Sequence, residues 1–66
     1  MKDFKKYIEY IKNTGDICKK EWFIYDWEPI GETLIIEMLH PDTDLIYLIK
    51  ENDTVYIKLT EKGMLL

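Results

Sequence analysis

The sequence predicts a small α+β domain that begins with a helix and ends with a β-hairpin. Apolar residues near the N-terminus recur at the spacing of one helical face, whereas the last third of the chain carries two runs of strand-forming residues around a polar turn. The chain has 66 residues, of which 47% are apolar. This is too apolar for a disordered chain and enough for one core, so we expect a single domain over residues 1–66.

A helix is predicted over residues 3–13. Its apolar residues follow the spacing i, i+4, i+7, and they are Phe4, Ile8 and Ile11. Asp3 can cap the first turn, and Gly15 can supply the left-handed residue that ends the helix.

The middle of the chain is consistent with two structures. As helices, residues 16–26 would begin at Asp16 as the N-cap, and residues 30–40 would carry rows of apolar side chains. As strands, residues near 21–27 and 33–39 are dense in β-favouring or apolar side chains. Local patterns leave both structures open.

The hairpin is expected from strands near 45–50 and 54–59, with a short polar loop at 50–53. Two architectures follow. Either three helices precede the hairpin, or one helix precedes a four-stranded antiparallel meander. Regularly spaced turn signals, at 28–31, 40–44 and in the hairpin loop, favour the meander on local grounds.

The end of the hairpin resembles the end of a winged helix-turn-helix domain. Residues 53–63 read DTVYIKLTEKG, and many bacterial and archaeal regulators of that superfamily have a Tyr-x-x-Leu-Thr-Glu-Lys-Gly run there. Residues 45–47 are similar to the start of the first wing strand. The resemblance covers residues 45–63 and implies three helices followed by a C-terminal hairpin. It also implies a recognition helix at 30–40 and a wing tip at 50–53.

The tail has a physical explanation of its own. Leu59 can close the apolar face of the hairpin, and Thr60 is a suitable N-cap for a final turn of helix. Glu61 is favourable at the positive end of that turn. Residues 64–66 are then expected to fold back onto the first helix.

The charge of the chain bears on the choice between two functions, DNA binding and protein binding. By the resemblance, the chain is expected to be a small DNA-binding or transcription-associated protein that contacts double-stranded DNA. However, the net charge is −4, and the expected recognition helix carries Glu32 and Glu37 but no Lys or Arg. The alternative is a winged-helix-like protein–protein interaction module that does not bind DNA.

Four lysines are the candidate nucleic-acid ligands: Lys19, Lys20, Lys50 and Lys58. In the resemblance, Lys50 would contact a phosphate from the wing, and Lys19 and Lys20 would contact the backbone from the second helix. The same lysines also fit the ordinary solvated surface of an acidic protein.

Three aromatic residues are candidates for contact with a protein partner or a second copy of the chain: Trp22, Tyr25 and Trp27. Together with Phe23 they could instead form the core. Because a chain of this length cannot bury all its aromatic rings, at least one of the four is expected to remain partly exposed.

The sequence predicts no enzyme, no metal site and no cofactor. Cys18 is the sole cysteine, and its isolation fits a reducing cytoplasm. His40 stands near Asp42 and Asp44 in a proline-containing segment that is typical of a turn. The chain has no apolar run of the roughly 20 residues that a membrane span requires, so we expect a soluble cytoplasmic protein.

Overall fold

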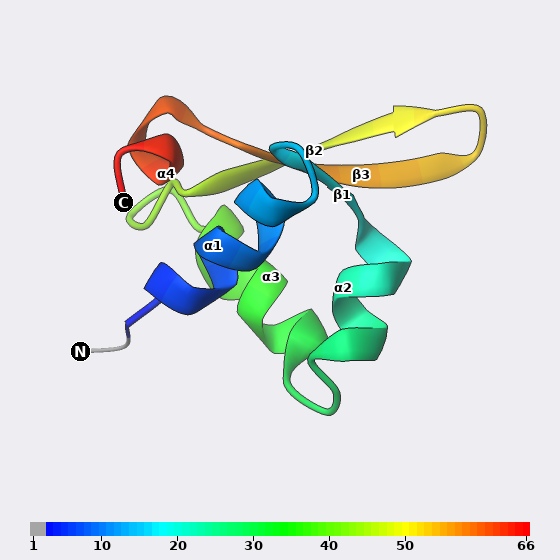
Figure 1. Ribbon diagram of the computed structural model, residues 1–66, viewed down its shortest axis with the longest axis horizontal. Helices are drawn as coiled ribbons and strands as arrows, with labels where there is room; N and C mark the ends of the chain where they lie inside the picture. The colour runs from blue at the N-terminus through cyan, green and yellow to red at the C-terminus, as the bar shows by residue number, and fades with distance from the viewer. Residues whose placement is uncertain (1–2) are drawn as a thin grey trace.

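The order of helices and strands gives an α+β domain. A computed structural model describes residues 3–66. Within them, the elements are α1 (Lys5–Asn13), β1 (Ile17–Lys19), α2 (Lys20–Asp26), α3 (Gly31–Leu39), β2 (Ile46–Glu51), β3 (Thr54–Leu59) and α4 (Glu61–Met64). The strands form one antiparallel sheet in the order β1-β3-β2, and Figure 1 shows α1, α2 and α3 gathered on one side of it. The predicted α+β class is confirmed.

The first helix matches its prediction closely. Its buried residues are Tyr7, Ile8 and Ile11. The Asp3 carboxylate accepts a hydrogen bond of 2.9 Å from the Lys5 backbone N–H, which provides an acceptor at the helix start. Gly15 has a φ of +88° just after the helix ends.

The segment after the first helix differs from its prediction, because β1 precedes α2. Asp16 does not cap a helix that starts there; it has a φ of +66°. The next three residues pair antiparallel with β3, and Cys18 lies opposite Ile57 in the core. The central strand β3 has backbone N–H and C=O groups along both edges. β2 pairs with one edge, and β1 supplies hydrogen-bond partners for part of the other. The helix predicted over residues 16–26 therefore begins only at Lys20.

The four-stranded meander is wrong, since residues 20–26 and 31–39 are helical. In α3, Leu34, Ile35 and Met38 are buried, whereas the exposed residues include Ile36. This spacing suits one face of a helix and not the alternation of a strand. A Cβ on Gly31 would lie 2.8 Å from the Ile24 Cα, so this glycine lets α3 approach α2 closely.

The hairpin has a tighter loop than predicted. The strands continue through Glu51 and resume at Thr54, and the two loop residues, Asn52 and Asp53, have φ values of +50° and +66°. Two left-handed residues give a turn whose twist matches that of the flanking strands. The hairpin predicted for this region is confirmed.

The C-terminal tail closes the domain as the sequence indicates. The Thr60 hydroxyl accepts a 3.0 Å hydrogen bond from the Gly63 N–H and donates a 2.6 Å bond to the Asp44 carbonyl oxygen. Leu59 is buried. The prediction that residues 64–66 pack on the first helix is wrong for Leu65, which is 82% exposed at the chain end.

One core joins the sheet to the helices. Its fully buried large side chains come from α1, α2, α3, β2 and β3, and they are Ile8, Ile11, Phe23, Leu34, Met38, Ile46 and Ile57. None of the helices within residues 3–66 has the length and apolar character that a bilayer crossing requires.

Candidate functional site

The sheet has two faces of different chemistry. Paired residues point to the same side of an antiparallel sheet. The row Cys18–Ile57–Leu48, in which Cys18 and Ile57 are buried and Leu48 packs partly buried against the core, marks the side that faces the helices. The alternate positions therefore point away from the helices, and we call this side the outer face. The outer face carries two full rows across the three strands: Ile17–Lys58–Tyr47 and Lys19–Tyr56–Ile49.

The four candidate lysines fall on both sides of the sheet. Lys19 and Lys58 belong to the outer face. Lys50 alternates in phase with the core residues of β2 and pairs with Val55, so it lies on the helix side near the hairpin tip. Lys20, in the first turn of α2, also lies on that side. The fold therefore divides the predicted set into two pairs and does not build one basic patch.

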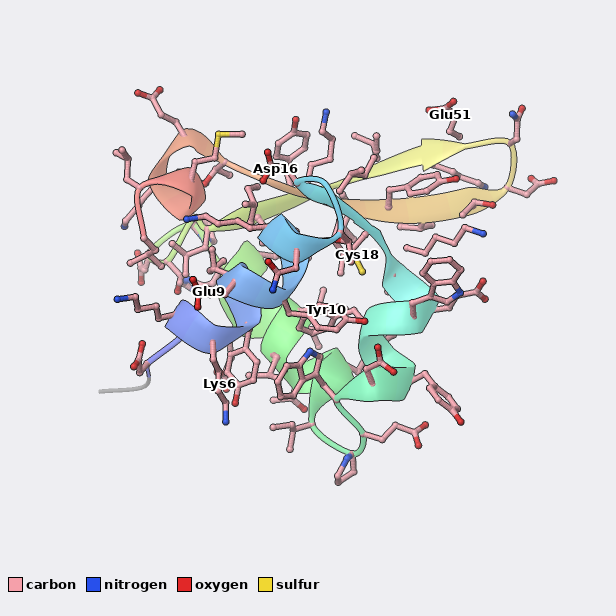
Figure 2. All side chains as sticks on the ribbon, in the orientation of Figure 1. Lys6, Glu9, Tyr10, Asp16, Cys18 and Glu51 are labelled. Carbon is pink, nitrogen blue, oxygen red and sulfur yellow. The ribbon has the colours of Figure 1, made fainter. Side chains whose placement is uncertain are left out.

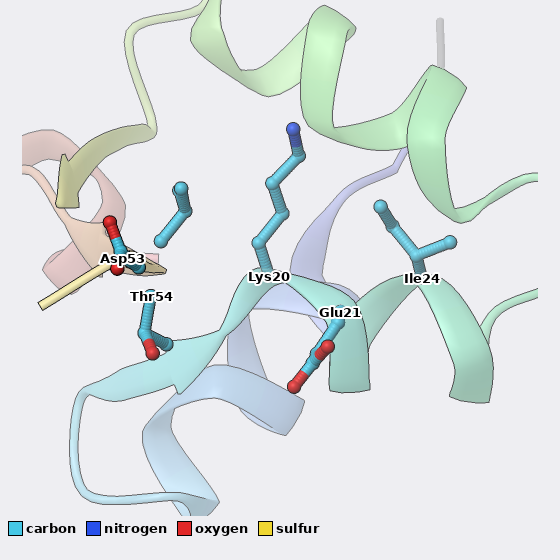
Figure 3. Close-up of a pocket in the computed structure, with 6 residues that line it drawn as sticks. Lys20, Glu21, Ile24, Asp53 and Thr54 are labelled. Atoms are coloured by element: carbon cyan, nitrogen blue, oxygen red, sulfur yellow. The ribbon is translucent and has the colours of Figure 1, made fainter.

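A hollow of about 320 Å³ separates the start of α2 from the hairpin tip. Figure 3 shows Lys20, Glu21 and Ile24 on one side of it and Asp53 and Thr54 on the other, and Val55 completes its lining. Two carboxylates accompany the one ammonium group. This balance of charge does not favour a phosphate ligand in the hollow.

The exposed side of α3 is acidic and apolar. Glu32, Thr33 and Ile36 are exposed, and the Ile36 side chain is 64% exposed. Glu32 and Ile36 are four residues apart, so their side chains lie on the same face of the helix about one turn apart. Because α3 contains no Lys or Arg, its own side chains offer no cation to a duplex.

The hairpin tip has a similar character. Glu51, Asn52 and Asp53 are all exposed there, and Lys50 is the one cation beside them along the strand. At neutral pH the segment 50–53 therefore carries two carboxylates against one ammonium group. A tip of this charge does not attract phosphates strongly.

The three candidate aromatic residues have different surroundings. Trp27 packs inside a cluster, with ring centroids 4.8 Å from Tyr7, 5.8 Å from Tyr10 and 6.2 Å from Phe23. Lys6 covers this cluster with its ammonium group 5.7 Å from the Trp27 ring centroid. This residue therefore stabilises the fold at the end of α2.

Trp22 and Tyr25 instead lie on the open side of α2, where they are 56% and 77% exposed. The Lys19 ammonium group stands 4.8 Å from the Trp22 ring centroid, which joins this ring to the outer face of the sheet. Of the three predicted partner-binding aromatic residues, these two are accessible.

Two ionisable groups, the Tyr10 hydroxyl and the Cys18 thiol, have pKa values that their contacts in the fold raise. The Tyr10 hydroxyl donates a hydrogen bond to the Asp26 carboxylate, and this bond together with burial raises the pKa of Tyr10 above its ordinary value. Figure 2 shows Tyr10 between α1 and α2. Burial also raises the pKa of the Cys18 thiol, which keeps it protonated near neutral pH and weakens it as a nucleophile.

His40 makes a local turn contact. Its Nδ1 accepts a 3.1 Å hydrogen bond from the Asp42 backbone N–H, and both side chains are largely exposed. Within residues 3–66, no group of three or more His, Cys, Asp or Glu side chains could hold a metal ion.

Sequence reasoning did not identify three accessible residues that stand out in the structure: Ile36, Tyr47 and Tyr56. The alternation of Tyr56 and Lys58 with buried Ile57 and Leu59 was a usable signal for one face of β3. What the sequence lacked was β1, whose pairing brings Lys19 beside Tyr56.

Comparison with protein-family models, with curated proteins and with solved structures finds no match to this chain.

Proposed function

We propose that the chain is a winged-helix domain that binds another protein through the exposed side of α3. The fold part of the proposal is supported by the order of elements. A helix, a short strand, two helices and a hairpin follow one another, and the short strand adds to the hairpin to give the sheet order β1-β3-β2. The three helices before a hairpin are the order that the resemblance in residues 45–63 implies, and the short strand β1 is an addition to it.

The observation that carries the functional part is the chemistry of α3. In a winged helix this element would be the recognition helix, and duplex DNA carries one negative charge per about 1.7 Å of its axis. Glu32 would face those phosphates without a cation on α3 to offset it. Ile36, in contrast, is an exposed apolar side chain that a protein pocket can bury.

The charge of α3 agrees with a protein partner of basic character. Glu32 places a carboxylate one helical turn from the exposed Ile36 side chain. Complementary charges would orient such a partner, and burial of Ile36 would supply affinity. The proposed partner surface is therefore an apolar pocket with Lys or Arg residues around it.

A photo-crosslinking residue at position 36 tests this proposal in the native host. We expect a specific protein adduct from position 36 and none from position 5, which is exposed on α1. With the purified partner, Ile36→Lys and Glu32→Lys should each weaken binding at least about tenfold, because loss of a central interface side chain costs about 2 kcal/mol or more and the new lysine repels a basic partner. Lys5→Glu serves as the control and should bind as the wild type does. Equal affinities for all four proteins would contradict the proposal.

Double-stranded DNA is the second candidate, and the positions of Lys20 and Lys50 favour it. Both lie on the helix side of the molecule, one at the start of α2 and one beside the hairpin tip. Wing and backbone contacts in winged-helix domains use such positions. In this case Lys50→Glu should weaken binding to every duplex sequence equally, since a phosphate contact carries no sequence information. An unchanged affinity would exclude a contact from the hairpin.

A further inference from the structure

The outer face of the sheet combines aromatic rings and ammonium groups in neighbouring positions. Lys58 stands beside Tyr47 across the β2–β3 pair, and Lys19 stands beside Tyr56 across the β1–β3 pair. Adjacent strands are about 4.8 Å apart, and successive rows on one face are about 7 Å apart. Each lysine therefore has an aromatic ring as its direct cross-strand neighbour.

Trp22 extends this surface beyond the strands. Lys19 connects it to the sheet through the contact with its ring at 4.8 Å, and more than half of the tryptophan side chain is still open. Tyr47 is 43% exposed at the opposite edge. The surface thus has an open aromatic ring at each edge and Tyr56 between them.

Acidic side chains are placed outside these two rows. Asp16 is one residue before the first residue of β1, and Glu51 is two residues beyond Ile49 along β2, on the same face but one row nearer the hairpin tip. Although the whole chain is acidic, the two full rows contain two lysines and no carboxylate. Their local charge is therefore positive.

This chemistry favours an anionic, ring-containing ligand over a second copy of the chain. Lys58 lies on the central strand, so two outer faces packed about a twofold axis near the sheet centre would bring two ammonium groups together. A duplex fits poorly as well, because its bases are already stacked on each other. Unstacked bases, in contrast, can stack on aromatic side chains while lysines contact the phosphates.

We propose that the outer face of the sheet binds a short single-stranded nucleic acid. The bases stack on Tyr47, Tyr56 and Trp22, and the phosphates lie against Lys19 and Lys58. This inference concerns the side opposite α3 and does not depend on the proposed function.

Fluorescence anisotropy with labelled oligo-dT and oligo-U of about 10 nucleotides tests the proposal at about 50 mM salt. Saturable binding is expected. If each of the two lysines neutralises one phosphate, the logarithm of affinity should fall with the logarithm of salt at a slope of about −1.4. Binding of both oligomers indicates recognition of bases and phosphates alone, whereas binding of oligo-U only adds a contact to the ribose hydroxyl. No saturable binding of either oligomer would overturn the proposal.

Two substitutions on the outer face should weaken this binding. Lys58→Glu removes a phosphate contact and Tyr47→Ala removes a stacking ring, so each should raise the dissociation constant about tenfold or more. Lys5→Glu makes the same charge change on α1 and should leave affinity unaltered. Ile36→Lys should also retain oligonucleotide binding, which separates this site from the α3 surface. Equal affinity in the wild type, Lys58→Glu and Tyr47→Ala would overturn the assignment.

Tryptophan fluorescence provides a readout that does not require the charge variants to fold. A base stacked on Trp22 should quench its emission, while Trp27 lies inside the aromatic cluster and should be insensitive. Oligo-dT should therefore quench Trp27→Phe but not Trp22→Phe. The reverse pattern would contradict the proposal. A second contradicting result would be a dimer, detected as a concentration-dependent mass, that Tyr47→Ala abolishes while oligonucleotides leave it unchanged. That result would assign the outer face to contact with a second copy of the chain.

Discussion

Gly63 is the residue at which the C-terminal tail meets the start of the hairpin. A Cβ at this position would lie 2.1 Å from the Leu45 carbonyl oxygen. That oxygen also accepts a 3.0 Å hydrogen bond from the Thr60 N–H, so the backbone around it has little freedom to move. The glycine of the Leu-Thr-Glu-Lys-Gly run therefore has a steric role in this fold.

Gly63→Ala should destabilise the domain by about 1–3 kcal/mol, because an added methyl group would force the two backbones apart. Urea denaturation followed by circular dichroism measures the change in the free energy of unfolding. Lys62→Ala is the neighbouring control on an exposed side chain and should stay within about 0.5 kcal/mol of the wild type. Equal midpoints for the two variants would contradict the close approach.

Tyr10 gives the domain a dependence on alkaline pH. In the unfolded chain its hydroxyl ionises near its ordinary pKa of about 10, whereas the hydrogen bond to the Asp26 carboxylate holds the pKa higher in the folded state. Because the folded-state pKa is raised, this contribution to stability is fully present below about pH 10 and is lost as pH rises further.

The corresponding variant is Tyr10→Phe. Between about pH 9 and pH 11 the wild type should lose more stability than Tyr10→Phe does, and absorbance titration should show that the variant lacks a tyrosine whose ionisation is displaced to higher pH. Tyr25→Phe is the control, since that ring is exposed on α2. If the three proteins lose stability in parallel, the hydrogen bond to Asp26 makes no contribution.

At the scale of elements, two adjacent residues of α3 differ sharply in burial. Ile35 is 2% exposed and belongs to the core, while its neighbour Ile36 points outward. One isoleucine therefore contributes to folding and the next is available for binding.

Ile35→Ala should cost about 2–5 kcal/mol of unfolding free energy, because it leaves a cavity in the core. Ile36→Ala should change it by less than about 0.5 kcal/mol. Chemical denaturation measures the free energy of unfolding of both variants, which carry the same Ile-to-Ala change at successive positions. A larger loss at position 36 than at position 35 would mean that the helix presents a different side to the core.

Long periodic segments could be predicted from the sequence, and short elements set by pairing could not. The first helix and the hairpin have clear local patterns, and the Thr60 cap was evident from its position. Residues 17–19 have no such pattern; they form a strand because β3 offers an open edge and Cys18 can be buried against Ile57. At residues 31–39, burial of Leu34, Ile35 and Met38 on one side of a helix selects helix over strand.

At the scale of the whole molecule, the distribution of charge matters more than the net charge of −4. The exposed side of α3 carries Glu32 and no Lys or Arg, whereas the two full rows on the outer face of the sheet carry Lys19 and Lys58 without a carboxylate. The candidate lysines could be named from the sequence. Their division between two sides could not, because it depends on the register of β1 with β3.

A chain can resemble a winged helix without binding duplex DNA, because the residues that carry the resemblance are not the residues that would contact the duplex. The tail and hairpin residues that carry the resemblance stabilise the fold, as the contacts of Thr60 and Gly63 show. If the proposed winged helix is correct, recognition of a duplex would depend instead on the exposed residues of α3, and these are Glu32, Thr33 and Ile36.

Titration of a labelled generic duplex with the purified protein at about 50 mM salt tests this account most directly, since phosphate attraction is strong under that condition. We expect no saturable binding by the wild type, whereas Glu32→Lys, which places a cation on α3, should bind detectably. Saturable, salt-sensitive binding of the wild-type protein that Lys50→Glu or Lys20→Glu abolishes would contradict the account and establish duplex DNA as the ligand of the α3 side.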